Sequence, residues 1–298
     1  MSIIDADTGI KIRDINLNGG GGVELIFNED GTRVYVSQME TASVFEIDTV
    51  TKEILRVFAT GGSWTKEMTI SPDGSKLYAS NWVSHDVSEI DLVSGKLIRR
   101  IKTVRTPRGL YISPDGRYLY VAGFQDGEIQ KINLATDERA ILIKTGGAMR
   151  HFVGDAGRGI FFASDMGRRR IYKVDIASDA VTEFALSDTN PNTIVLSPDK
   201  KILIVSCRGI NYSATDYSRP GTEWGTVLLF DSHSGKLLDA IIGGNQPTAL
   251  AVSPDGSKIA FSDFLDSKIE FYSVPAYSVL ASDVSRPWLT AYKSYIRK

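Results

Sequence analysis

The chain has 298 residues, of which 42% are hydrophobic and 23% are charged, a composition typical of folded proteins and unlike that of disordered chains. Its 34 lysines and arginines nearly balance its 36 aspartates and glutamates, which argues against a basic surface for nucleic acid or anionic membranes. The single cysteine, Cys207, excludes an intrachain disulfide and is expected to be a small buried thiol. No stretch is long and apolar enough for a transmembrane helix, and the first 20 residues show no signal-peptide pattern.

A turn motif recurs along the chain with a period of about 42 residues. Ser-Pro-Asp-Gly occupies residues 71–74, 113–116 and 253–256, and degenerate copies occupy residues 28–31, 154–157 and 197–200. A second motif, an apolar residue followed by Asp or Asn, recurs with the same spacing from Ile4-Asp5 to Phe230-Asp231. Both series stretch only once, in the same repeat, so a single insertion explains both.

The expected elements follow in chain order. The chain opens with two strands, over residues 2–5 and 10–17. Each later unit is predicted to hold four short strands, which we call A to D: A precedes the Ser-Pro-Asp-Gly turn, B follows it, C ends at the apolar-Asp pair, and D follows that pair. In the last unit, residues 269–274 and 279–280 are the expected strands C and D, and residues 286–292 align with the start of a further strand A.

Four-stranded units of this length are typical of an all-β propeller, because radial repetition leaves only short sheet edges. The repeats of a β-solenoid, the alternative, are usually shorter. We therefore predict a single domain over residues 1–298, a seven-bladed β-propeller of four-stranded blades. Its closing blade would mix the C-terminal strand A with the N-terminal strands C and D, and six blades are the alternative count.

The repeat resembles the YVTN family of β-propeller repeats. The matching segments include Leu119-Tyr120-Val121-Ala122 and Val87-Ser88-Glu89-Ile90-Asp91, together with the Ser-Pro-Asp-Gly turns. The resemblance implies an extracytoplasmic protein of the periplasm or cell surface. It implies no functional residues, since the family has no shared catalytic motif.

Binding residues are expected on the propeller face where the D–A and B–C connections open, because these connections depart from the repeat consensus. Two adjacent positions of the D–A connections, aligned between repeats, carry side chains of both charge signs. They predict a mixed-charge group near the axis. The insertion, residues 208–225, belongs to the same face, and long loops in compact repeats are often functional. Aromatic side chains on a polar face suit sugars or peptides. The predicted ligand-binding residues are Glu24, Trp64, Lys66, Glu67, Trp82, Arg108, Arg150, His151, Asn192, Arg208, Tyr217 and Trp224.

These residues leave three classes of function open. The favoured one is a non-enzymatic extracytoplasmic module that binds a glycan, peptide or protein partner, without a cofactor. The second is a calcium-assisted lactonase or lyase at the same face, similar to the metal-dependent propeller lactonases. The third is a structural surface-layer repeat protein. The oxygens that could hold Ca²⁺ belong to Glu24, Glu67, Asn190, Asn192, Asp165 and Asp263.

Overall fold

The structure, a computed structural model, describes all residues except 214–215, 283 and 296–298. The chain divides into two compact units, residues 1–149 and 150–298, which we describe separately as unit 1 and unit 2. That residues 1–298 form a single domain stays a prediction. Among the described residues, no helix is long and apolar enough to cross a membrane.

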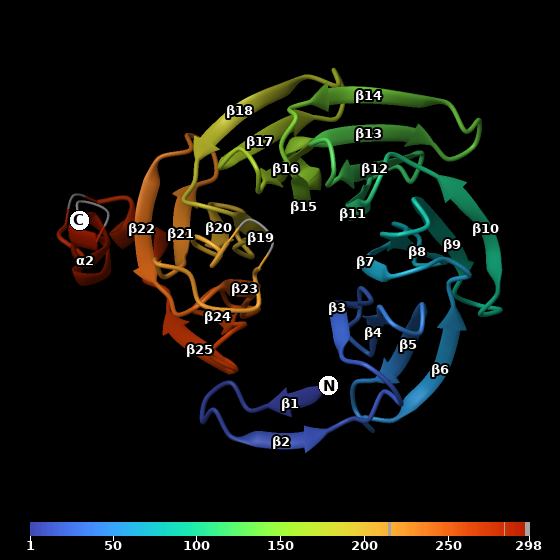
Figure 1. Ribbon diagram of the computed structural model, residues 1–298, viewed down its shortest axis with the longest axis horizontal. Coiled ribbons are helices and arrows are strands. Elements are labelled where there is room, and N and C mark those ends of the chain that lie inside the picture. Colours follow the sequence, from blue (N-terminus) through green and yellow to red (C-terminus); the bar gives the residue numbers. More distant parts are fainter. Residues whose placement is uncertain (214–215, 283, 296–298) are drawn as a thin grey trace. The chain divides into compact units, whose positions relative to one another are not determined.

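Unit 1 holds a two-stranded hairpin and three four-stranded antiparallel blades (Figure 1). The hairpin pairs β1 (Ser2–Ile4) with β2 (Lys11–Asp14). Blade 1 contains β3 (Gly22–Phe27), β4 (Arg33–Gln38), β5 (Ser43–Asp48) and β6 (Ile54–Ala59). Blade 2 contains β7 (Thr65–Ile70), β8 (Lys76–Asn81), β9 (Asp86–Asp91) and β10 (Leu97–Lys102). Blade 3 contains β11 (Pro107–Ile112), β12 (Tyr118–Gly123), β13 (Glu128–Asn133) and β14 (Arg139–Lys144).

Unit 2 holds two four-stranded blades, one three-stranded blade and two helices (Figure 1). Blade 4 contains β15 (Met149–Asp155), the 3-10 turn η1 (Ala156–Arg158), β16 (Ile160–Asp165), β17 (Arg170–Asp175) and β18 (Val181–Leu186). Blade 5 contains β19 (Pro191–Leu196), β20 (Ile202–Cys207), β21 (Thr226–Asp231) and β22 (Leu237–Ile242). Blade 6 contains β23 (Pro247–Val252), β24 (Lys258–Asp263) and β25 (Lys268–Ser273). The helices are α1 (Tyr277–Leu280) and α2 (Pro287–Tyr295).

The core of each unit lies between neighbouring blades. Strands B and C are mostly buried, whereas strands D keep many exposed residues. In unit 1, Tyr78 and Val87 of blade 2 pack in one cluster with Leu110 and Leu119 of blade 3. Because strands A of successive blades also contact one another, as β3, β7 and β11 do, residues of strands A from different blades come close together.

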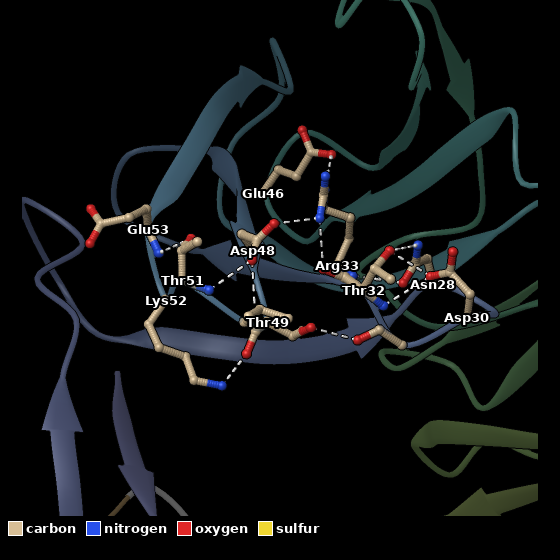
Figure 2. Close-up of polar contacts among 12 residues, drawn as sticks. Asn28, Asp30, Thr32, Arg33, Glu46, Asp48, Thr49, Thr51, Lys52 and Glu53 are labelled. Carbon is tan, nitrogen blue, oxygen red and sulfur yellow. Dashed lines mark hydrogen bonds and ion pairs between the residues drawn. The ribbon is translucent and has the colours of Figure 1, made fainter.

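Figure 2 shows how side chains of blade 1 stabilise its two turns. Asp48 at the C–D turn accepts hydrogen bonds from the backbone nitrogens of the second and third residues after it, both at 2.9 Å. Its other oxygen accepts a 2.6 Å bond from Arg33, which follows the A–B turn. The Thr49 hydroxyl donates to the carbonyl of Gly31 at 2.7 Å, joining the two turns. The recurring Asp and Gly therefore act as the turn residues that the sequence predicted.

The last position of the A–B turn has a left-handed backbone in blades 1, 2, 3, 5 and 6. Gly31, Gly74, Gly116 and Gly256 have φ between 69° and 75°, a region where glycine avoids the clash that a Cβ atom would make. Lys200 holds the same position in blade 5 with φ of 60°. The degenerate Ser-Pro-Asp-Lys motif therefore keeps the turn at the expense of local strain.

The prediction of seven blades is wrong in its last step, because the described chain forms six blades. Strand C over residues 269–274 is confirmed as β25, but residues 279–280 belong to α1 rather than to a strand D. The expected seventh strand A, residues 286–292, lies mostly in α2, which packs against β22. Pro287 suits the first position of a helix, and the buried Tyr292 donates a 3.0 Å hydrogen bond to Asp188. Burial of one helix face therefore outweighs the alignment with strand A.

Candidate functional site

The predicted charged residues lie where the strands A are irregular. Pairing of strand A with strand B shifts register between Gly22 and Leu25 in blade 1, and between Thr65 and Met68 in blade 2. The same shift occurs at the start of the strands A of blades 3, 5 and 6. A bulge of this kind interrupts the ladder and turns side chains in a new direction. The residues placed at these irregular positions include Glu24, Lys66, Glu67, Arg108 and Asn192.

A serine of strand B bonds to the start of strand A in blades 1, 2, 4, 5 and 6, and it is not among the predicted residues. The Ser80 hydroxyl accepts a bond from the backbone nitrogen of Glu67 at 3.0 Å and donates to the carbonyl of Arg108 in the next blade at 2.8 Å. Ser37 links Glu24 to Lys66 in the same way, at 3.2 and 2.5 Å. Alignment of the repeats would have shown this signal, since serine follows a small or β-branched residue at one position of most strands B. The equivalent serines of unit 2 are Ser164, Ser206 and Ser262.

In unit 1 these bonds place a buried cation beside two carboxylates. Arg108 is only 7% exposed, and its Nε and Nη1 atoms make no hydrogen bond within the described part of the chain. Burial lowers the pKa of Arg108, while the negative charges of Glu67 and Glu24 oppose this shift. Glu67 is buried as well, and Glu24 is half-buried. Three of the predicted residues are therefore close enough to interact electrostatically.

Lys66 lies beside this cluster, among aromatic rings. Its ammonium is 5.5 Å from the ring centre of Trp64 and 5.8 Å from that of Trp82. Burial and, to a smaller degree, repulsion from Arg108 together lower the pKa of Lys66 to about 8, against the attraction of Glu40. Trp64 has a left-handed backbone with φ of 59° and stays 48% exposed. This edge of unit 1 therefore brings a buried guanidinium, an ammonium and an exposed indole ring close together.

In unit 2 the predicted residues form a separate hydrogen-bonded group. Arg150 Nε donates to Oδ1 of Asn192, and the Asn192 amide donates to the carbonyl of Thr248 at 3.1 Å. The backbone nitrogen of His151 donates to Ser164 at 3.2 Å. These bonds tie blades 4, 5 and 6 together, a structural role for Arg150 and Asn192 in addition to any contact with a ligand.

The predicted residues of the insertion lie in two different environments. Arg208 donates to the side chain of Gln246, and its guanidinium lies 5.8 Å from the ring centre of Tyr217. Gln246 in turn donates to the carbonyl of Tyr217 at 2.8 Å. Trp224 instead lines a cavity at the end of the insertion. Arg208 and Tyr217 therefore stabilise the loop, whereas Trp224 faces open space.

The calcium prediction stays a prediction, and the described residues fit it poorly. The carboxylates of Glu24 and Glu67 interact with the Arg108 guanidinium, with which a divalent ion would have to compete. In unit 2, the side-chain oxygen of Asn192 accepts a bond from Arg150, and the Asp263 carboxylate accepts one from the backbone of Gly244 at 3.0 Å. Ca²⁺ takes six to eight oxygen ligands, which neither unit brings together from these residues. We derive no chemical step through a metal ion.

Comparison with known families and proteins finds similar sequences. The sequence model of a family described as lactonase, 7-bladed beta-propeller, matches residues 13–142. Antigen Lp49 of Leptospira interrogans is 33% identical over 283 residues, which cover 91% of this chain. The chain spans only 62% of the length of that relative. The family model names seven blades, whereas six are described here.

Solved structures confirm that the chain is a β-propeller protein. The Kuenenia stuttgartiensis hydrazine synthase matches with a TM-score of 0.75 at 20% identity, covering 94% of this chain and 84% of that chain. A Bacteroides uniformis protein proposed to be a 6-phosphogluconolactonase matches with a TM-score of 0.71 at 18% identity, covering 91% and 86%. At these identities the likeness shows the fold alone. The YVTN assignment stays a prediction.

The prediction of a non-enzymatic binding module is corrected by these findings. The match to a lactonase family favours the enzyme alternative. The enzyme alternative could not be favoured from the sequence alone, because the charged residues form no recognised catalytic motif. Glu24, Glu67 and Arg108 come close together only in the folded unit 1, where the irregular strands A of three blades meet.

Proposed function

We propose that this protein is a hydrolase that opens lactone rings at the edge of unit 1 that carries Glu67, Glu24 and Arg108. The observation that carries the proposal is the buried Arg108, whose Nε and Nη1 atoms make no hydrogen bond to a described residue. A carbonyl oxygen that gains negative charge is a suitable acceptor for such a preorganised donor. The lactonase family match over residues 13–142 supports the same reaction class.

The reaction assigns a role to each group. Glu67 takes a proton from water as the water oxygen bonds to the lactone carbonyl carbon, and the carbonyl electron pair moves onto oxygen beside Arg108. When the carbonyl re-forms, the ring C–O bond breaks and the proton passes from Glu67 to the departing alkoxide. The product is a hydroxy acid, which releases a proton to neutral solvent. Glu24, the second carboxylate near Arg108, helps to hold the guanidinium in place.

Hydrolysis of 6-phosphogluconolactone and glucono-δ-lactone in a pH-stat tests this proposal. We expect Glu67→Gln to lower kcat/KM by about 10²- to 10⁴-fold through loss of the base. Arg108→Gln should lower it by about 10²- to 10³-fold through loss of the donor to the oxyanion. Glu53→Gln is the matched control in unit 1, because Glu53 lies in an exposed turn and its carboxylate pairs with Arg13 on the surface.

Circular dichroism and thermal unfolding must first show that all three variants are folded. Hydrolysis no faster than the buffer blank for both lactones would contradict the proposal. So would full activity in both Glu67→Gln and Arg108→Gln. The extracytoplasmic location implied by the YVTN resemblance is part of the proposal, and fractionation of the source cells tests it.

A further inference from the structure

Unit 2 contains a cavity that plays no part in the proposed hydrolysis. Its volume is about 490 Å³, within the usual range for sites of small molecules. It lies between the connection that precedes β19, both ends of the insertion, and the last residue of α2. Its lining includes Arg169, Asp188, Ile210, Glu223, Trp224 and Tyr295.

Close backbone contacts hold the walls of this cavity in place. A Cβ atom at Gly209 would lie 3.0 Å from the carbonyl oxygens of Glu223 and Trp224, and one at Gly225 would lie 2.3 Å from the carbonyl oxygen of Cys207. Glycine therefore lets the two ends of the insertion close on each other. The Tyr295 hydroxyl donates to the carbonyl of Trp224 at 3.1 Å, which ties α2 to the same wall.

Asp188 is fixed from the opposite side. It accepts a 2.6 Å hydrogen bond from Thr226 and a 3.0 Å bond from Tyr292 of α2. The cavity is thus built from β21, α2 and both ends of the insertion, and its polar groups have defined positions.

Two charged side chains of the lining remain available to a ligand. The side chains of Arg169 and Glu223 form no hydrogen bond or ion pair with another residue that the structure describes, whereas the backbone carbonyl of Arg169 is bonded. A guanidinium only donates hydrogen bonds and a carboxylate only accepts them. A hydroxyl group does both, so neighbouring hydroxyls of a sugar can satisfy this pair together.

The aromatic wall supplies the complementary apolar contact. Trp224 is 58% exposed although it lines the cavity, and Tyr295 is a second aromatic residue of the lining. The apolar face of a pyranose stacks on such a ring and buries a large area. Two carboxylates against one guanidinium disfavour phosphates and nucleotides, which carry negative charge. We propose that this cavity binds a carbohydrate, with one pyranose ring stacked on Trp224.

The test uses the full chain and six free sugars: glucose, galactose, mannose, N-acetylglucosamine, cellobiose and maltose. Saturation-transfer NMR and isothermal titration calorimetry measure binding. We expect saturable binding of at least one sugar, with Trp224→Ala raising its Kd at least tenfold and Trp224→Phe raising it less. Arg169→Gln should raise the Kd several-fold. Trp288→Phe is the matched control, because Trp288 is also about half exposed but lies outside the cavity lining.

The result is independent of lactone hydrolysis, since Glu67→Gln should bind the sugar as tightly as the unchanged protein. Absence of saturable binding for all six sugars would overturn the proposal. Unchanged sugar affinity in Trp224→Ala would also overturn it. So would a loss of sugar binding in Trp288→Phe but not in Trp224→Ala. Binding of a peptide library in place of the sugars would assign the cavity to a different class of ligand and contradict our inference.

Discussion

Replacing Ile171 with alanine should destabilise unit 2 far more than replacing Ile269, although both residues occupy the same position of strand C. Ile171 pairs with Ser164 of strand B, and Ile269 pairs with Ser262. Ile171 is 0% exposed and has Ala185 of the fourth strand beside it. Ile269 is 47% exposed, because the described part of blade 6 has three strands.

The difference follows from burial and from the cavity that the change leaves. A fully buried isoleucine truncated to alanine loses about 2–5 kcal/mol of stability, part of it because the surrounding side chains cannot fill the space. At Ile269 about half of the side chain is already in water, and no enclosed cavity forms at an open edge. We therefore expect a loss of about 3 kcal/mol for Ile171→Ala and about 1 kcal/mol for Ile269→Ala.

Urea unfolding followed by far-ultraviolet circular dichroism measures both losses from the shift in midpoint at constant slope. Ile171→Val, expected to lose about 1 kcal/mol, is an intermediate control. Equal losses for the two alanine variants would refute the reasoning, because they would mean that Ile269 is covered as fully as Ile171.

Two further predictions concern a strained turn and a charged pair. Lys200→Gly should stabilise the protein by about 0.5–1 kcal/mol in urea unfolding, because glycine relieves the left-handed strain at that position, whereas Lys201→Gly should destabilise it. Arg108→Gln should raise the pKa of Lys66 from about 8 toward that of a free lysine, since one cause of the lowering is repulsion from Arg108. Burial, the larger cause, remains, so the pKa stays below its ordinary value. Carbon-13 NMR of the lysine ε positions measures the change in pKa. An unchanged pKa of Lys66 would contradict the close approach of Arg108 to Lys66.

The turns and inner strands could be predicted from the sequence because their causes are local. Ser-Pro-Asp-Gly and the Asp of strand C determine backbone conformation within four residues, and their regular spacing reveals the blades. The last blade could not be predicted in this way. The segment that contains Trp288 and Tyr292 looks like a strand A in alignment, but the contacts that decide its conformation, with β22 and Asp188, lie far away in sequence.

The candidate site shows the same division. Glu24, Glu67 and Arg108 became candidates because they occupy positions that depart from the repeat consensus. The turn and strand patterns of the repeat do not require a particular residue at these positions. Repeat spacing could not show that Arg108 is buried or that Lys66 lies between two tryptophans, since both depend on packing between blades. It also placed Arg150 and Asn192 in the same class, although these two bond to each other within unit 2.

Burial of Arg108 distinguishes it from the other arginines of unit 1. Arg99 pairs with the buried Glu89 at 2.6 Å and also donates to the carbonyl of Leu134 at 2.7 Å, so its charge and its donors are used within the fold. Arg108 is more deeply buried, yet two of its donor atoms make no hydrogen bond to a described residue. A buried donor without an acceptor destabilises a protein by about 1–3 kcal/mol, and an apolar residue of similar size would avoid that loss. Stability alone therefore does not account for an arginine at this position, and in the proposed hydrolysis an oxygen of the substrate would be the acceptor.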